Sequence, residues 1–479
     1  MTRGDWEPLL DDLAARRRAA LEMGGPDRLA KHRASGKLTA RERIAVLCDP
    51  GTFVEIGALA GSLPADAFVA GSGLVEGRPV LVGAEDFTVA GGSIGAANTA
   101  KRNRVAALAA AQRCPLVMML EGAGHRPPMP DDPPSTARPT DLQPLAELRG
   151  IVPQATAVLG PSAGHGALAA PMADFSVMTE RAAIFAAGPP LVKASLGEDV
   201  DAATLGGPAV ALASGLIHNV APDDATALAM IRQWLSYLPP AAGDPLPLGP
   251  AEGRRVIDDL IDLVPRNPRQ AYDMVDVITR VVDHDTWFEI QPRFGPSLLT
   301  GLARLGGRTV AIIANQPRSH AGAITADAAM KAADFITNLE PFAVPLVFLT
   351  DNPGVLAGTA SEQAGILRAA ARMYAAQHRS RSAKLQVTLR KAYGFGSSVM
   401  AMNPFDGQTL SVAFPGVTFG GMPARGADAA MRATAEDAAA MVQAELASGY
   451  RSAHGLSIDD LIDPRHTRNV LLDALRLVR

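Results

Sequence analysis

The chain has 479 residues, of which 48% are hydrophobic and 20% are charged, and its formal net charge is −4. These values are typical of a globular protein with two or more domains, and they give no reason to expect nucleic acid or an anionic membrane as a partner. No apolar run reaches the ~18 residues of a transmembrane helix, and residues 1–10 lack the apolar core of a signal peptide. Two cysteines, Cys48 and Cys114, are too few for a disulfide framework or a four-thiolate zinc site. We therefore expect a cytoplasmic protein without a bound metal.

Residues 6–43 have the pattern of a charged helical arm, with basic runs at 16–18 and 31–33 that are typical of a solvated helix face. Thr39 follows a turn at Gly36 and Lys37, so it is expected to be the N-cap of a second short helix.

The elements that follow alternate between strands and helices. Residues 75–87 predict two strands joined at Gly77 and Arg78, and a glycine-rich turn at 91–95 leads into a helix over 96–113. Strands are predicted at 116–120 and 155–159. Between these two strands, residues 125–144 are rich in Pro, Asp and Ser, and we interpret them as a mobile segment or a lid.

The last of these strands leads into the turn Gly164-His165-Gly166, which precedes an alanine-rich helical stretch. Glycines between a strand and a helix allow backbone N–H groups to face a cavity, with the positive end of the helix behind them. Such a place can stabilise an oxyanion.

The same turn recurs 230 residues later as Gly394-Phe395-Gly396. One ungapped offset relates both stretches over their whole length, which indicates a duplicated domain. The matching pairs are Gly77-Arg78 with Gly307-Arg308, Val80 with Val310, Gly92 with Gly322, Ile94 with Ile324, Lys101 with Lys331, residues 115–117 with 345–347, and Gly124 with Gly354.

Residues 239–250 (PPAAGDPLPLGP) form the best candidate linker, so we predict an N-terminal domain over 1–238 and a C-terminal domain over 251–479. The second domain is expected to have α/β character like the first. Its predicted helices cover 273–281, 325–339 and 361–377, its predicted strands lie within 288–313 and at 345–349 and 384–388, and its tail is mostly helical after an N-cap at Thr434.

Several residues near the turns have ordinary structural interpretations. His165 and His320 are expected to be satisfied structural histidines, and Glu121 and Glu198 are expected to be solvated surface acids. Ser162-x-x-His165 could supply a nucleophile and a base, but a hydrolase needs a third, orienting group.

Taken together, a set of motifs spread over nearly the whole chain resembles the carboxyltransferase β subunit of biotin-dependent acyl-CoA carboxylases, of the propionyl-CoA carboxylase type. The motifs are residues 36–43 (GKLTARER), 49–55 (DPGTFVE), 86–93 (DFTVAGGS), 153–154 (PQ), 314–317 (ANQP), 351–354 (DNPG) with 358–359 (GT), 390–394 (RKAYG) and 463–468 (DPRHTR).

The resemblance implies two crotonase-like domains per chain, each a ββα superhelix, and a homo-hexamer built as a trimer of dimers. It also implies an N-terminal domain that binds acyl-CoA and a C-terminal domain that binds biotin, which a biotin carboxylase and carrier subunit delivers. The transfer would move a carboxyl group from carboxybiotin to the α carbon of the acyl-CoA, and the biotin anion would remove the α proton.

Carried over by motif, one oxyanion hole falls on Gly164, His165 and Gly166 and the other on Phe395 and Gly396. Substrate contacts are implied at Gly124, Gly394 and, for acyl-chain selectivity, Ser398.

The chain departs from the family pattern at matching places. The family has Ala-Gly-Gly-Ala where this chain has residues 163–166 (AGHG), and Gly-Gly-Ala-Tyr where it has residues 394–397 (GFGS). These departures keep other hypotheses open: a non-catalytic paralogue within a carboxylase complex, a biotin-dependent acyl-CoA decarboxylase subunit, and hydrolysis or isomerisation of CoA esters.

Overall fold

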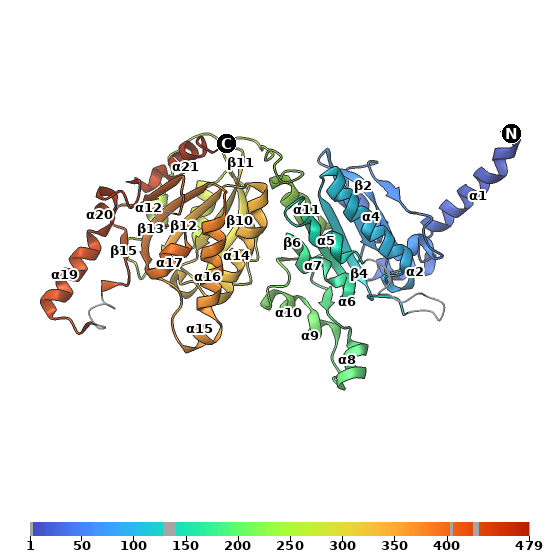
Figure 1. Ribbon diagram of the computed structural model, residues 1–479, viewed down its shortest axis with the longest axis horizontal. Helices are drawn as coiled ribbons and strands as arrows, with labels where there is room; N and C mark the ends of the chain where they lie inside the picture. The colour runs from blue at the N-terminus through green and yellow to red at the C-terminus, as the bar shows by residue number, and fades with distance from the viewer. Residues whose placement is uncertain (1–2, 128–139, 403–405, 425–430, 479) are drawn as a thin grey trace. The chain divides into compact units, whose positions relative to one another are not determined.

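The computed structural model describes residues 3–127, 140–402, 406–424 and 431–478, so most of the predicted segment 125–144 lies outside the described residues. The chain divides into two compact units, Met1–Asp244 (unit 1) and Pro245–Arg479 (unit 2). This division falls inside the predicted linker 239–250. Figure 1 shows that each unit is built on one sheet with helices packed against it.

The sheet of unit 1 has eight strands among the described residues, in the order β1-β2-β3-β4-β5-β6-β8, with β7 paired to the far end of β5. The first two pairings are antiparallel, and all later ones are parallel. The strands are β1 Val54–Ile56, β2 Phe68–Val75, β3 Arg78–Glu85, β4 Leu116–Gly122, β5 Gln154–Ala163, β6 Phe175–Thr179, β7 Ala183–Phe185 and β8 Asn219–Ala221.

The described part of unit 2 repeats this sheet as β9-β10-β11-β12-β13-β14-β16, with β15 paired to β13. The strands are β9 Phe288–Ile290, β10 Leu298–Leu305, β11 Arg308–Asn315, β12 Leu346–Asn352, β13 Lys384–Tyr393, β14 Leu410–Ala413, β15 Thr418–Gly420 and β16 Asp460–Leu461.

The two sheets confirm the duplication that the offset of 230 predicts. The four strands β2 to β5 have the same offset to β10 to β13 at both ends, and the register shift between Leu120 and Gly122 recurs between Thr350 and Asn352. The structure also corrects the predicted strand limits. β2 begins at Phe68 rather than at Val75, and β5 and β13 each extend several residues further, up to the glycine turns.

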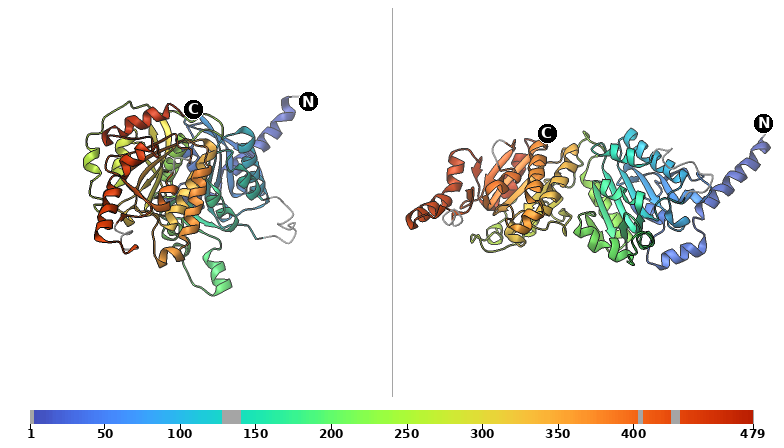
Figure 2. Two further views of the ribbon diagram at one scale, coloured as in Figure 1. Left: turned by 60° about the vertical axis from the view of Figure 1, so that its left-hand side comes forward. Right: turned by 60° about the horizontal axis from the view of Figure 1, so that its bottom comes forward.

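The helices of unit 1 are α1 Arg3–Leu21, α2 Pro26–Ala34, α3 Ala40–Leu47, α4 Ala96–Gln112, α5 Leu142–Leu148, α6 Gly164–Ala167, α7 Ala169–Met172, α8 Pro189–Leu196, α9 Ala202–Gly206, α10 Pro208–Ala213 and α11 Asp224–Tyr237. Those of unit 2 are α12 Leu260–Leu263, α13 Met274–Val281, α14 Ala326–Leu339, α15 Thr359–Gln363, α16 Ile366–Arg379, α17 Gly394–Val399, α19 Ala435–Leu446, α20 Ser448–His454 and α21 Thr467–Leu475. Helix α1 projects from the rest of unit 1 (Figure 2). None of the helices within the described residues combines the length and the apolar character needed to cross a membrane.

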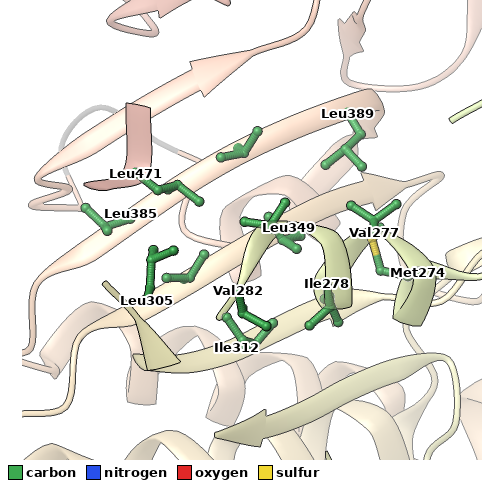
Figure 3. Close-up of a cluster of buried hydrophobic side chains, with 14 of the residues drawn as sticks. Met274, Val277, Ile278, Val282, Leu305, Ile312, Leu349, Leu385, Leu389 and Leu471 are labelled. Atoms are coloured by element: carbon green, nitrogen blue, oxygen red, sulfur yellow. The ribbon is translucent and has the colours of Figure 1, made fainter. Parts of the chain in front are cut away.

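Each unit has its own hydrophobic core between the sheet and its helices. In unit 2, α13 covers one face of the sheet and buries Met274, Val277 and Ile278 against Leu349 of β12 and Leu389 of β13 (Figure 3). The other face packs against α14 and α16. This packing holds the central strands rigid and so fixes the position of the turns that follow them.

Thr39 is the N-cap of α3, as predicted. Its side chain accepts a hydrogen bond from the Glu42 backbone, and the Glu42 carboxylate accepts one from the Thr39 N–H at 2.8 Å, which completes a capping box. We expect Thr39→Ala to lower the free energy of unfolding of unit 1 by about 1 kcal/mol, as measured by urea denaturation. Arg17→Ala, at an exposed position of α1, is the control and should change that free energy by less than about 0.5 kcal/mol.

Candidate functional site

The turn of unit 1 is set by the end of strand β5. Ala163 keeps an extended backbone, and Gly164 then adopts φ of 61°, a conformation that favours glycine and starts α6. The first N–H groups of a helix have no partner inside the helix. The backbone of Gly164, His165 and Gly166 therefore offers donors at the carboxyl end of the parallel sheet, where a developing oxyanion can be stabilised.

A second loop reaches the same place from the end of β4. Gly124, with φ of 83°, accepts a hydrogen bond from Ile94 N at 2.8 Å, and a Cβ on Gly124 would lie 3.0 Å from the Ala163 carbonyl oxygen. The structure thus brings Gly124 next to the Gly164 turn, as the family motif implies.

Unit 2 repeats this arrangement. Tyr393 has the same φ and ψ as Ala163, −125° and 147°, and Gly394 has φ of 59°. Gly396 packs on the loop after β12, because a Cβ there would lie 2.8 Å from Gly354 Cα. Phe395 is half exposed and Ser398 is partly buried one turn into α17. The predicted residues therefore form two clusters, one in each unit.

A buried carboxylate lies at the same position beneath each turn. Glu121 in β4 and Asp351 in β12 are related by the offset of 230, and both are completely buried. The prediction that Glu121 is a surface acid is therefore wrong, whereas Glu198 is exposed.

The cations that neutralise these carboxylates come from different parts of the chain. Glu121 pairs with Lys37 at 2.7 Å and with Arg43 at 2.6 Å, both from the N-terminal arm. Asp351 pairs instead with Arg390 at 2.6 Å and Lys391 at 3.1 Å, both in the neighbouring strand β13. The prediction of a solvated helix face also fails for His32, which is buried 3.7 Å from Glu121.

His165 takes part in a buried ionic network. Its Nε2 lies 2.5 Å from Asp141 Oδ1, and Arg102 contacts the other oxygen of Asp141 at 3.3 Å. Arg102 also pairs with Glu85, which accepts a hydrogen bond from Glu121 N at 2.6 Å. Burial acts to raise the pKa of Asp141, but the hydrogen bond from His165 and the charge of Arg102 outweigh it, so the Asp141 pKa lies below its ordinary value. Asp141 is therefore an anion at neutral pH. The prediction of His165 as a structural histidine did not include this charged partner.

The network is confined to unit 1. The positions equivalent to Glu85, Arg102 and His165 hold Asn315, Ala332 and Phe395. Asn315 keeps one role of Glu85, because its Oδ1 accepts a hydrogen bond from Asp351 N at 3.1 Å. At these three positions the two copies of the domain have different residues, and this difference is the signal in the sequence that could have revealed the network. Nothing in the sequence marks Asp141.

The interpretation of Ser162 and His165 as a nucleophile and a base can be compared with the structure. Ser162 is buried, and no hydrogen bond within the described residues joins it to His165, so a Ser–His pair does not form.

Lys101 and Lys331 are buried equivalents, and burial lowers their pKa values to about 8 and about 7. Both cysteines are free and buried, and no cluster of three or more metal-ligating side chains occurs among the residues that the structure describes.

Comparison with known proteins relates this chain to a described family. A family model described as the carboxyl transferase domain matches residues 31–479. The mitochondrial propionyl-CoA carboxylase beta chain of Sus scrofa is 33% identical over 95% of this chain and 87% of its own length. The methylmalonyl-CoA carboxyltransferase 12S subunit of Propionibacterium freudenreichii subsp. shermanii is 34% identical over 98% of this chain and 94% of its own. A solved structure of transcarboxylase 12S, described as a hexamer assembly with methylmalonyl-coenzyme A bound, has a TM-score of 0.92, is 33% identical, and covers 100% of this chain and 96% of that one.

Proposed function

The chain belongs to the carboxyl transferase family, and we propose that it moves a carboxyl group from carboxybiotin on a separate carrier protein to the α carbon of an acyl-CoA. In this role it is the carboxyltransferase component of a biotin-dependent acyl-CoA carboxylase. The acyl-CoA is the substrate, and biotin reaches the site on another subunit.

The observation that carries this proposal is the duplicated turn. Each unit ends a buried parallel strand at a glycine with positive φ, and each turn exposes backbone N–H groups beside a second glycine loop. A reaction in which two partners both develop negative charge on oxygen needs two such places. We assign the thioester enolate to the turn at Gly164, His165 and Gly166, and the ureido oxygen of biotin to Phe395 and Gly396.

The direct test is carboxyl transfer with separated partners. The purified protein is mixed with a biotin carrier that bears labelled carboxybiotin and with acyl-CoAs of two to eight carbons, and label in a stable carboxyacyl-CoA is measured. Transfer to any acyl-CoA supports the proposal. No transfer with every donor and acceptor, together with stable binding to an active β subunit, would favour the non-catalytic paralogue.

We expect Ser398 to set the acyl-chain preference, because the family resemblance places each active site between the N-terminal domain of one subunit and the C-terminal domain of another. Its partly buried side chain is small, and replacement by isoleucine adds volume one turn into α17. Ser398→Ile should therefore shift the ratio of kcat/KM values toward shorter acyl-CoAs by about tenfold, the discrimination available from one or two methylenes. Unchanged preference in a folded variant would show that the pocket is assigned wrongly. A hexamer of this chain and a cytoplasmic location remain predictions.

A further inference from the structure

We propose that His165 donates a proton to the α carbon of the bound acyl thioester, so that unit 1 can decarboxylate a 2-carboxyacyl thioester without any biotin carrier. This inference rests on the proposed function, because it requires the thioester to lie at the Gly164 turn. It goes beyond that function, in which the carrier supplies the carboxyl group and, as the biotin anion, the base.

The geometry makes His165 able to hold a transferable proton. Its Nε2 faces Asp141 at 2.5 Å, and that carboxylate is kept charged by the buried Arg102. A fixed anion stabilises the imidazolium form of a histidine. Within the described residues no hydrogen bond uses Nδ1 of His165, and the side chain is 13% exposed. The ring is thus held at Nε2 by Asp141, which leaves Nδ1 as the nitrogen proposed to transfer the proton.

The titratable and charged groups around this ring are His125, Arg102 and Asp141. The ring of His125 lies beside it, with 4.7 Å between centroids, and burial together with the charge of His165 lowers the pKa of His125. Arg102 is fully buried and paired with Glu85 as well as Asp141. Burial thus disfavours the charged form of His125, which leaves His165 as the ring proposed to carry the proton.

The other copy of the domain serves as an internal comparison. Phe395 occupies the position of His165, Val355 that of His125 and Ala332 that of Arg102, so none of the three equivalent positions can titrate. The strand–turn–helix backbone is nevertheless the same in both units. The network is therefore not needed to build the turn, and it occurs only in the unit assigned to the thioester.

The proposed step is balanced without any further reactant. The bond between the α carbon and the carboxylate breaks, CO₂ leaves, and the electron pair enters the thioester as an enolate held by the backbone donors of the turn. The imidazolium of His165 then transfers its Nδ1 proton to the α carbon. The neutral ring regains a proton from water, while Nε2 stays hydrogen-bonded to Asp141.

The experiment measures proton transfer directly. The full chain is incubated in D₂O with propionyl-CoA and no carrier, and exchange of the α hydrogens is followed by NMR. A parallel assay follows CO₂ release from methylmalonyl-CoA and any free CoA. We expect exchange and decarboxylation by the wild type, and a loss of about 100-fold in His165→Gln, the usual contribution of a positioned acid–base group. His165→Gly is a second variant that removes the ring without adding a new side chain.

Asp141→Asn tests the positioning role. It should slow exchange because the His165 ring loses the carboxylate that holds it, and Asp141→Glu, which keeps the carboxylate, should restore part of the rate, an effect that a purely structural role would not produce. The matched control is His378→Gln in unit 2, which removes another histidine–aspartate pair, with His378 Nδ1 2.9 Å from Asp406, and should leave exchange unchanged.

The failures of the two proposals are distinguishable. Carrier-dependent transfer with no carrier-free exchange overturns the inference and leaves the proposed function intact. Exchange that is lost in His165→Gln supports the inference even if carrier-dependent transfer fails. Exchange that is equal in wild type and His165→Gln, or release of free CoA in place of CO₂, overturns it.

Discussion

Gly394→Val is expected to lower the rate of carboxyl transfer by about 100-fold or more, the loss that follows when an oxyanion donor is displaced. Gly394 has φ of 59°, which is strongly unfavourable for a β-branched residue. A Cβ at this position would also lie 3.2 Å from the Gly421 carbonyl oxygen, so the turn has to shift. The measurement is kcat/KM for carboxyl transfer at saturating carrier.

The control separates backbone strain from loss of the turn. Gly243 also has positive φ, 83°, but a Cβ there meets nothing within 4 Å. Gly243→Val should therefore cost some stability and keep the transfer rate within about twofold of wild type, since surface changes away from such features have small effects. A folded Gly394→Val variant with wild-type kcat/KM would show that this turn does not hold the reacting oxygen.

Glu121→Ala is expected to lower the free energy of unfolding of unit 1 by about 3–5 kcal/mol, the typical result of removing one partner from a buried ion pair. Arg43 is 1% exposed and would keep only one carboxylate, Asp224 at 2.8 Å, beside the Leu159 carbonyl oxygen at 3.3 Å, while Lys37 would lose its partner. Urea unfolding followed by hydrogen exchange in peptides of unit 1 measures the change, and peptides of unit 2 should be unaffected.

A matched surface pair provides the control. Asp12 and Arg16 form an i, i+4 pair at 2.8 Å in which both side chains are mostly exposed. Asp12→Ala should change the free energy of unfolding by no more than about 0.5 kcal/mol. A similarly small effect of Glu121→Ala would mean that the arm cations are not held by this carboxylate.

Much of the fold could be predicted because the same strand, helix and turn patterns occur twice, at an offset of 230 residues, and each copy supports the assignment of the other. The helix over 96–113 and the turn at Gly164 each gain support from an equivalent segment 230 residues later, and the cap at Thr39 follows from its own local pattern. The limits of β2 and β5 could not be predicted in the same way. Their ends are set by hydrogen bonding to a partner strand, β3 for β2 and β7 for the end of β5, rather than by local composition.

The sequence predicted the two backbone turns that the structure contains, but it missed the side chains that surround the first of them. Gly124 and Gly164 come together because parallel strands end at the same edge of a sheet, which a strand assignment already implies. The contact between His165 and Asp141 depends instead on where the segment between β4 and β5 places Asp141. The spacing of residues in the sequence does not determine that position. The burial of Glu121 was missed because its partners Lys37 and Arg43 lie in the N-terminal arm, whose charged pattern predicts a solvent-exposed helix.

The origin of the cations around the two buried carboxylates has a consequence for the order of events during synthesis. Arg390 follows Asp351 by 39 residues, so unit 2 can neutralise its carboxylate as soon as β13 is made. Lys37 precedes Glu121 by 84 residues, and Arg43 precedes Asp224 by 181. The arm therefore leaves the ribosome long before its carboxylates exist, and its cations can be paired only after β4 and α11 have been made.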